Sequence, residues 1–398
     1  MDIEASKARE VLAANGPDEV SRRISLLRGS MAREGIDVFY VGLSTDLEYL
    51  AGIERPLHQY GRLRFWADWV IGGVVGPEGT PVLMLTRHLT KGHLNELGAP
   101  IRGLEVVVVN ESDEPTEVVA ATLRRIAGRD PRTIAINVDA PAALALNLRS
   151  IFPAATVSID TQILATLRSV KSDAELAAMA DACELVDRTY EHALGIVRPD
   201  MTEIELAREI DAHMISLGAV APSFKTDIWT MGPSEKRTVG ERARDQPIGT
   251  GTSLNFDFGA GLRGYCSDFG RTVFIGKPPT RYIEAYGLVV GAQAAGAAAL
   301  RPGTSASEVD RQARAVIEAG GYGEWFWHRL GHSIGKDTHE PPFLDITDDT
   351  LLEEGMCFTI EPSIFIPGEF GCRVEDVYVV TREGGRRMNH VSAEMRTV

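Results

Sequence analysis

Two aspartates in the stretch NFDFGAGLRGYCSDFGRT, residues 255–272, have the spacing of residues that face each other across a β-hairpin. Asp257 alternates with apolar residues, as on the polar face of a strand, and a glycine-rich turn follows. With the turn centred between Leu262 and Arg263, Asp257 falls opposite Asp268. Opposed residues on one face have Cβ atoms roughly 4.5–5.5 Å apart, where two like charges are destabilising. Something must therefore relieve the repulsion within this pair.

A second acidic pair occurs in CFTIEPSIFIPGEFGCRVEDVYVVT, residues 357–381, which is typical of a strand, a Pro-Gly turn and a strand. Glu361 and Glu375 lie on opposite arms, symmetric about Gly368. Burying four carboxylates in one site would cost on the order of several kcal/mol for each charge. Shared protons could relieve the repulsion, but two divalent ions roughly 3.5–4 Å apart with shared carboxylate bridges account better for the number of acids.

A histidine often completes such a site, and the stretch EWFWHRLGHSIGKDTHEPPF, residues 324–343, contains His328, His332 and His339. His332 lies among glycine and serine, as a backbone packed close to a site requires. One imidazole among oxygen ligands suits Mn, Co, Zn or Fe better than Ca. The alternative is a pair of surface hairpins with solvated charges.

The elements around these residues repeat. RPDMTEIELAREIDAHMISLGA begins at Arg198, and RPGTSASEVDRQARAVIEAGG begins 103 residues later at Arg301. Both show Arg-Pro, a turn, a helical pattern and a glycine stop, and the two acidic hairpins follow at nearly the same offset. Internal similarity at a fixed offset indicates a duplicated unit. We expect two helix-plus-sheet halves related by a pseudo-twofold axis, which disfavours the surface-hairpin alternative.

The rest of the chain predicts an α/β (α+β) protein of two domains, 1–160 and 161–398. Residues 20–160 alternate helical and strand patterns, with WVIGGVVG and PVLMLT typical of a hairpin. Ser172 with Glu175, and Thr202 with Glu205, have the spacing of capping boxes at the start of two helices.

Composition excludes several classes of function. The chain has 398 residues, 44% of them hydrophobic, and a formal net charge of −15, which disfavours nucleic acid or an anionic membrane as a main partner. No apolar run approaches the roughly 18 residues of a membrane span, and no signal peptide is evident, so a cytoplasmic location is expected. The four cysteines are widely spaced, which indicates reduced thiols.

The motifs resemble those of the pita-bread metallohydrolases, a family that includes prolidase, aminopeptidase P, creatinase and methionine aminopeptidase. The stretch GIDVFYVGLSTDLEYLAGI resembles part of the creatinase-type N-terminal domain, and the chain from LRSVKSDAEL onward resembles the catalytic domain. The matching motifs are DFG, SDFGRT, GHSIG, TIEPS and GCRVED. They imply a creatinase-like N-terminal domain, a pita-bread catalytic domain and five metal ligands, namely Asp257, Asp268, His332, Glu361 and Glu375.

The resemblance also implies roles within this site. Asp268 and Glu375 would bridge two metal ions, with Asp257 on one ion and His332 and Glu361 on the other, and a bridging water would ionise easily. His339 would contact the substrate near the scissile bond, as a catalytic group together with His332 and Glu361. Arg373 would orient a bridging carboxylate or bind substrate, and His328 would also bind substrate. A homodimer is expected on the same basis.

The sequence departs from the family pattern in two ways. Gly270 stands where threonine is usual, and Ser333 and Ser363 stand where glycine is common. The segment 224–251 lacks the histidine with which peptidases and creatinase usually bind substrate. It is either a solvated basic loop or a segment that binds an anionic substrate, with Arg237 and Arg242 as substrate-binding residues. Its cations are Lys225, Lys236, Arg237, Arg242 and Arg244.

The function expected first is a metal-dependent hydrolase of the Xaa-Pro dipeptidase (prolidase) type, acting on a small substrate that carries a carboxylate. Two alternatives stay open. One is a family member acting on a small metabolite, as a creatinase-like hydrolase or a dimethylsulfoniopropionate-lyase-like enzyme, which the missing histidine favours. The other is a non-catalytic binding homologue, which the intact ligand set disfavours.

Overall fold

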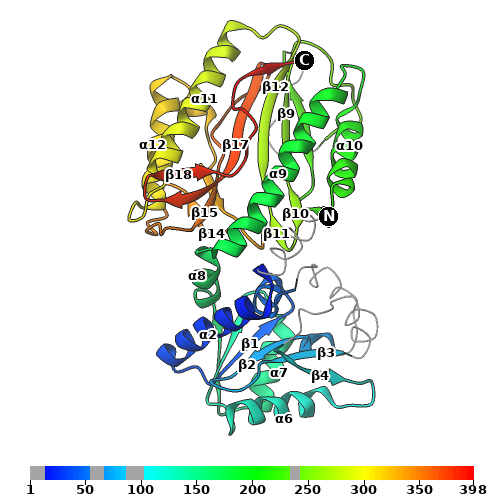
Figure 1. Cartoon of the computed structure of the whole chain (residues 1–398), viewed down its shortest axis with the longest axis vertical. Helices are drawn as coiled ribbons and strands as arrows, with labels where there is room; N and C mark the ends of the chain where they lie inside the picture. Colours follow the sequence, from blue (N-terminus) through cyan, green and yellow to red (C-terminus); the bar gives the residue numbers. More distant parts are fainter. Residues whose placement is uncertain (1–13, 54–66, 87–102, 234–242) are drawn as a thin grey trace, which may run out of the picture. The chain divides into compact units, whose positions relative to one another are not determined.

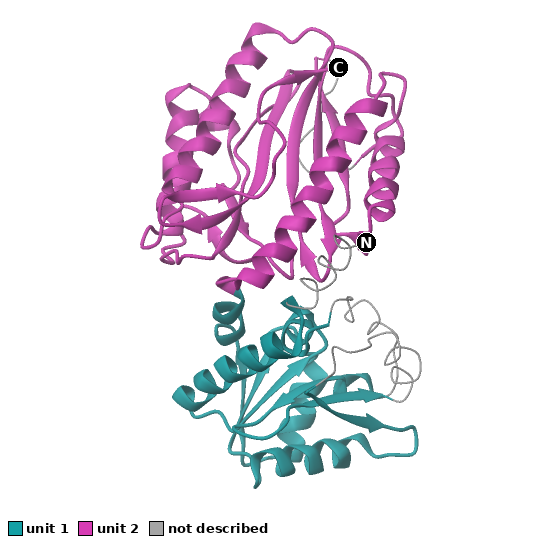
Figure 2. Ribbon diagram, viewed as in Figure 1, with its two compact units in different colours: residues 1–168 teal, residues 169–398 magenta. Residues whose placement is uncertain are grey.

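The computed structural model describes residues 14–53, 67–86, 103–233 and 243–398. The chain forms two compact units, residues 1–168 and residues 169–398, each built around its own sheet (Figures 1 and 2). None of the described helices is long and apolar enough to cross a membrane. All four cysteines are free thiols, as expected from their spacing, and three of them are buried.

The first unit is a six-stranded mixed sheet covered by helices on both faces. Its order is β4-β3-β2-β1-β5-β6, and the predicted hairpin is β2 with β3. Phe39 and Val41 of β1 pack into one apolar cluster while Val38 and Tyr40 pack into another, because alternate side chains point to opposite faces. The elements are α2 (Pro17–Glu34), β1 (Val38–Gly42), α3 (Thr45–Ala51), η1 (Asp68–Val70), β2 (Gly72–Val75), β3 (Val82–Thr86), β4 (Glu105–Val109), α6 (Pro115–Ala127), β5 (Thr133–Asn137), α7 (Ala142–Ile151), β6 (Thr156–Asp160) and α8 (Ile163–Ser169).

The second unit is a large sheet with four long helices packed against it (Figure 1). The main path of the sheet runs β14-β13-β15-β17-β12-β9-β8, and a small sheet has the order β11-β10-β7. The helices are α9 (Asp173–Ile196), α10 (Glu203–Ser216), α11 (Thr280–Ala299), α12 (Ala306–Ala319) and the short η3 (Gly323–Trp325). The strands are β7 (Ala221–Pro222), β8 (Asp227–Met231), β9 (Thr252–Phe258), β10 (Ala260–Leu262), β11 (Tyr265–Cys266), β12 (Phe269–Ile275), β13 (Gly331–Ser333), β14 (Glu340–Leu344), β15 (Cys357–Ile360), β16 (Ser363–Ile366), β17 (Phe370–Thr381), β18 (Gly384–Arg387) and β19 (Arg396–Thr397).

The predicted duplication is visible in the helices and in the core. Helices α10 and α12 are each 14 residues long, and α12 begins 103 residues after α10. Thr202 and Ser305 cap them at matching positions, and both predicted capping boxes, at Ser172 and Thr202, are formed. One apolar cluster joins α9 and α10 to β8, β9 and β12, while another joins α11 and α12 to β15, β16 and β17. Each half therefore has its own core on a shared sheet.

The first acidic hairpin has a different register from the predicted one. Leu262 pairs with Tyr265, so the turn consists of Arg263 and Gly264, with φ angles of 54° and 75°. Two successive positive φ angles are typical of the type I′ turn that joins twisted strands. The pairing consequently shifts by two residues, and Asp257 lies opposite Gly270 rather than opposite Asp268.

The second acidic hairpin has the predicted register. Ser363 pairs with Arg373 in β16 and β17, and Ile360 pairs with Asp376 in β15 and β17. Both pairings are centred on Gly368, so Glu361 and Glu375 hold matching positions on the two arms. The break between β15 and β16 falls at Glu361 and Pro362, because proline cannot donate a ladder hydrogen bond.

Candidate metal centre

A cavity of about 560 Å³ opens in the second unit, and all five predicted ligands line it. They come from different strands of the large sheet: Asp257 from β9, His332 from β13 and Glu375 from β17. Asp268 directly precedes β12, and Glu361 directly follows β15. The other lining residues are Phe224, Lys225, Asp227, His328, Arg329, His339, Asp345 and Arg373.

A row of residues across β8, β9, β12 and β17 brings acidic side chains together. Asp227 pairs with Asp257, Asp257 with Gly270, and Gly270 with Glu375. A Cβ at position 270 would lie 2.5 Å from Glu375 Oε2 and 2.9 Å from Glu375 Cβ. Gly270 therefore leaves space for the Glu375 side chain beside Asp257. The family usually has threonine at this position.

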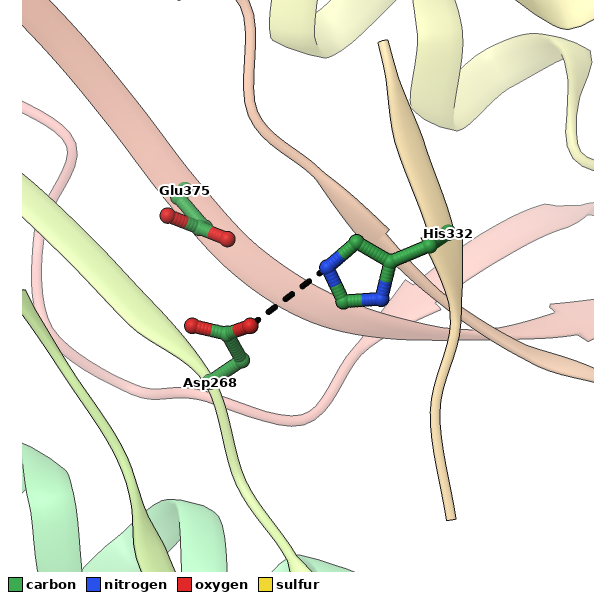
Figure 3. A group of neighbouring side chains, drawn as sticks. All are labelled: Asp268, His332 and Glu375. Carbon is green, nitrogen blue, oxygen red and sulfur yellow. Dashed lines mark ion pairs between the residues drawn. The ribbon is translucent and has the colours of Figure 1, made fainter. Parts of the chain in front are cut away.

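Asp268, His332 and Glu375 form the tightest group of the site, with one ligand atom from each within 4.8 Å of the others (Figure 3). His332 Nδ1 lies 3.1 Å from the carbonyl oxygen of Ser333, so this nitrogen carries the proton. Nε2 lies 3.5 Å from Asp268 Oδ2 and 3.5 Å from Glu361 Oε1. A backbone contact that fixes the tautomer and leaves Nε2 facing the acids is the usual arrangement of a metal-binding histidine.

The donor set fits a divalent metal centre because four carboxylates gather around His332 and Arg373 is the one cationic side chain that contacts them among the described residues. Asp268 Oδ1 and Glu375 Oε2 are buried and accept no hydrogen bond from any described residue. Burial, together with the neighbouring carboxylates, raises the pKa of Asp257 to about 7 and raises the pKa of Glu375 well above its ordinary value. Bound cations would reverse both shifts, since a nearby positive charge favours the ionised carboxylate.

Arg373 is bound to these carboxylates. Its Nη1 donates to Asp257 Oδ2 at 2.7 Å, and the guanidinium lies within 3.7 Å of Glu361 and Glu375 oxygens. The sequence left open whether this arginine orients a bridging carboxylate or binds substrate. Its hydrogen bond orients Asp257, which is not one of the two carboxylates expected to bridge, and this arginine lies 3.7 Å from Glu375, which is one of them.

The two other predicted histidines differ in their surroundings. His328 Nδ1 lies 2.6 Å from the carbonyl oxygen of Arg329, and its Nε2 contacts the Ser363 hydroxyl. Burial lowers the pKa of His328 to about 4, so the ring is neutral and both nitrogens are already engaged. His339 is exposed in the cavity and makes no hydrogen bond to any described residue, with its ring centroid 4.1 Å from that of His332.

Sequence reasoning missed Asp227, Arg329 and Asp345, which also line the cavity. Asp227 belongs to a short apolar strand, and its position opposite Asp257 could be recognised only once β8 and β9 were paired. Among the cations of segment 224–251, Lys225 is exposed at the cavity, and the backbone N–H of Arg244 donates to Glu203 Oε2 at 2.8 Å. Lys236, Arg237 and Arg242 lie outside the described residues.

The pKa of Asp257 leads to a pH prediction for protein treated with EDTA. This carboxyl binds a proton in the folded chain below about pH 7, but in the unfolded chain only below roughly pH 4. Folding therefore takes up a proton between these values, and the free energy of unfolding decreases as the pH rises through 7. We expect the thermal midpoint of the EDTA-treated protein to be higher at pH 6 than at pH 8.

The Asp257→Asn variant is the matched control, since an amide at this position cannot titrate. Its thermal midpoint should depend less on pH across the same range, when both proteins are measured after EDTA treatment. Identical pH dependence in the wild type and the variant would contradict the assignment of the shifted pKa to Asp257.

Comparison with known proteins finds relatives of both units. Residues 177–382 match metallopeptidase family M24, and residues 23–170 match the creatinase/prolidase N-terminal domain. A Xaa-Pro dipeptidase from Lactobacillus delbrueckii subsp. lactis is 31% identical over 94% of this chain and 98% of that protein. A Bacillus subtilis protein named as an uncharacterized peptidase is 38% identical over 58% of this chain and 64% of its own length. The structure of a Xaa-Pro dipeptidase from Bacillus anthracis is similar with a TM-score of 0.82 at 27% identity, covering 95% of this chain and 100% of that one.

Proposed function

This chain belongs to metallopeptidase family M24 and is a metal-dependent, prolidase-like hydrolase, and we propose that it cleaves Xaa-Pro dipeptides at the site built around Asp268. The observation that carries the proposal is that the four predicted carboxylate ligands and His332 line one cavity, where buried oxygens of Asp268 and Glu375 accept no hydrogen bond from a described residue. Similarity over nearly the whole length to a Xaa-Pro dipeptidase supports the choice of substrate.

The proposed ligands are Asp257, Asp268, His332, Glu361 and Glu375. Two divalent ions held there would ionise a water and polarise the scissile carbonyl. Arg373 holds Asp257 towards the cavity, and the Ser333 carbonyl fixes the His332 tautomer.

Two further residues act on the substrate in this proposal. Burial would raise the pKa of Glu361, but Arg373 and His332 outweigh it and hold this pKa below its usual range, so Glu361 is ionised and can accept a proton. Desolvation in the cavity and the neighbouring His332 lower the pKa of His339, so its ring is neutral at pH 7. A neutral imidazole can donate one hydrogen bond to the carbonyl as negative charge develops on its oxygen.

Three finer properties are proposed from the sequence and from the family resemblance. The ions are two in number and are Mn, Co, Zn or Fe, in line with one imidazole among oxygen donors. The chain forms a homodimer, and it is located in the cytoplasm. Elemental analysis and light scattering of the purified protein test the first two properties.

The alternatives from the sequence are less well supported. The histidine missing from segment 224–251 favoured a creatinase-like or lyase-like enzyme, and a non-catalytic binding protein was a separate alternative. The near full-length similarity to a Xaa-Pro dipeptidase and the intact set of five cavity residues favour a peptidase instead.

The test of the function is hydrolysis of Ala-Pro by protein loaded in turn with Mn, Co, Zn and Fe. We expect turnover with at least one metal, complete loss after treatment with EDTA, and recovery when that metal is restored. Creatine and dimethylsulfoniopropionate serve as comparison substrates. If the protein converts creatine or dimethylsulfoniopropionate but not Ala-Pro, it acts on a small metabolite and the proposed peptidase function is wrong.

A further inference from the structure

One loop carries a proposed metal ligand at one end and a proposed substrate contact at the other. His332 lies in β13, and His339 directly precedes β14, so the connection between these two strands joins them. The centroids of the two imidazole rings lie 4.1 Å apart. The conformation of this loop therefore determines whether the His339 imidazole lies beside the proposed metal site.

The backbone pairing of β13 with β14 is interrupted where the loop ends. His332 of β13 pairs with Phe343 of β14. The next residue, Ser333, pairs with Glu340, so the register changes and residues 341 and 342 lie between the two pairs on β14. Both are prolines, which have no N–H to donate to a ladder. Backbone hydrogen bonds alone therefore hold this register weakly, and side chains must contribute.

The side chain of Lys171 contacts both residues of the pair beyond the interruption. Its Nζ lies 3.4 Å from Ser333 Oγ and 3.4 Å from Glu340 Oε2. It also donates to the Ser169 carbonyl oxygen at 3.3 Å, so three acceptors surround the three donors of the ammonium group. The side chains of Lys171 and Glu340 are only 2% and 5% exposed. Solvent therefore screens this ion pair little, and the contact can fix the register of the two strands.

Glu340 connects this ion pair to the backbone around His339. Its Oε1 accepts from the N–H of Asp337 at 3.0 Å, while its Oε2 faces Lys171. The backbone of Gly335, the last residue of the GHSIG motif, packs against the same groups. A Cβ at this position would lie 3.0 Å from both Glu340 carboxylate oxygens and 3.1 Å from Lys171 Cε. His339 thus lies within a turn that the Glu340 carboxylate closes.

His332 has contacts of its own at the other end of the loop. Its backbone N–H donates to Thr359 Oγ1 at 3.1 Å, and the following residue, Ser333, belongs to the ladder with β15. These contacts come from a strand that does not include the Lys171 ion pair. Loss of that pair should therefore displace His339 and leave His332 in place.

We propose that Lys171 is a positioning residue, which acts through Glu340 to hold the His339 imidazole beside the proposed metal site. The inference rests on the proposed function, in which His339 donates a hydrogen bond to the substrate. Lys171 is absent from the described residues that line the cavity, so it acts without touching the substrate. It belongs to the LRSVKSDAEL stretch, which no step of the proposed hydrolysis uses.

The first variant is Lys171→Met, which removes the ammonium group and keeps most of the length of the side chain. A displacement of roughly 1 Å at a reacting group can cost on the order of 10²-fold in rate. We expect kcat for Ala-Pro to fall by about 10–10²-fold, with KM and metal content close to those of the wild type. Metal content that falls in proportion to kcat would overturn the inference, because the lysine would then support the ligands.

A second variant separates this effect from a loss of stability. Lys171→Met leaves a buried carboxylate without its cation, which is destabilising, whereas Lys171→Met with Glu340→Gln removes both charges. The double variant should recover the thermal midpoint but not kcat. Arg168→Met is the matched control, because Arg168 forms an ion pair of similar burial with Asp46 in the first unit. It should lower the thermal midpoint and leave kcat unchanged. Recovery of kcat together with the thermal midpoint in the double variant would overturn the inference.

A double-mutant cycle tests whether Lys171 acts through His339. If it does, adding Lys171→Met to His339→Ala should lower kcat no further, because the group being positioned is already absent. An equal fall in kcat in the wild-type and His339→Ala backgrounds, or an unchanged kcat in Lys171→Met, would overturn the inference.

If the wild type does not cleave Ala-Pro, the proposed function fails, and crystal structures of the variants then decide on the role of Lys171. The ring centroids of His332 and His339 should stay about as close in Arg168→Met as in the wild type. They should separate when Lys171→Met is combined with Glu340→Gln. An unchanged His339 position in that double variant would show that the ion pair does not position the ring.

Discussion

Replacing Asp268 with alanine is expected to remove both metal ions and abolish hydrolysis of Ala-Pro. Asp268 belongs to the tight group with His332 and Glu375, and its side chain is 5% exposed. Its Oδ2 faces His332 Nε2 at 3.5 Å, and its buried Oδ1 accepts no hydrogen bond from a described residue. Because Asp268 is proposed, on the family resemblance, as a ligand shared by the two ions, both ions should be lost together.

Elemental analysis of purified variants measures this effect as a graded series. The wild type should retain two ions, Asp257→Ala about one, and Asp268→Ala close to none. Asp345→Asn provides the control, because Asp345 lines the cavity without belonging to the proposed ligands, and this variant should keep both ions. Two ions retained in Asp268→Ala would falsify the bridging role, whatever happens to activity.

Much of the second unit could be predicted from the sequence because the signals are local. Thr202 and Ser305 cap helices of equal length at a constant offset, so the duplication could be recognised before any contact was known. The second hairpin was also predictable, since the Pro-Gly turn at residue 368 sets the register that places Glu361 opposite Glu375. The predicted family membership is confirmed by the comparisons.

Other features depend on pairings between distant segments. The predicted pairing of the first hairpin was wrong by two residues because its turn includes Arg263, which has a positive φ angle. Positive φ angles are usually adopted by glycine, so the sequence gives no sign that an arginine occupies this turn position. The contact of Arg329 with Phe343 arises only when β13 pairs with β14, and that pairing changes register between His332 and Ser333. Such contacts result from tertiary structure, so no local pattern predicts them.

Replacing His339 with alanine should lower kcat for Ala-Pro by about 10²–10³ and leave the metal content unchanged. The ring is exposed in the cavity beside His332 and makes no hydrogen bond to a described residue, so its donor is available to the substrate. Removing one donor aimed at a developing oxyanion typically costs about this factor. Because the bond strengthens as charge develops on the oxygen, the loss should appear in kcat more than in KM.

Two further variants separate this role from ligation and from support of the fold. His339→Gln retains an N–H donor and should recover part of the rate that His339→Ala loses. This recovery is expected if His339 donates a hydrogen bond, but not if the imidazole only fills space. His328→Gln disturbs a ring whose nitrogens already contact Arg329 and Ser363, so its main effect should be on thermal stability. If elemental analysis shows that His339→Ala loses metal in proportion to activity, His339 is a ligand. The hydrogen bond to the substrate carbonyl would then have to come from another group of the cavity.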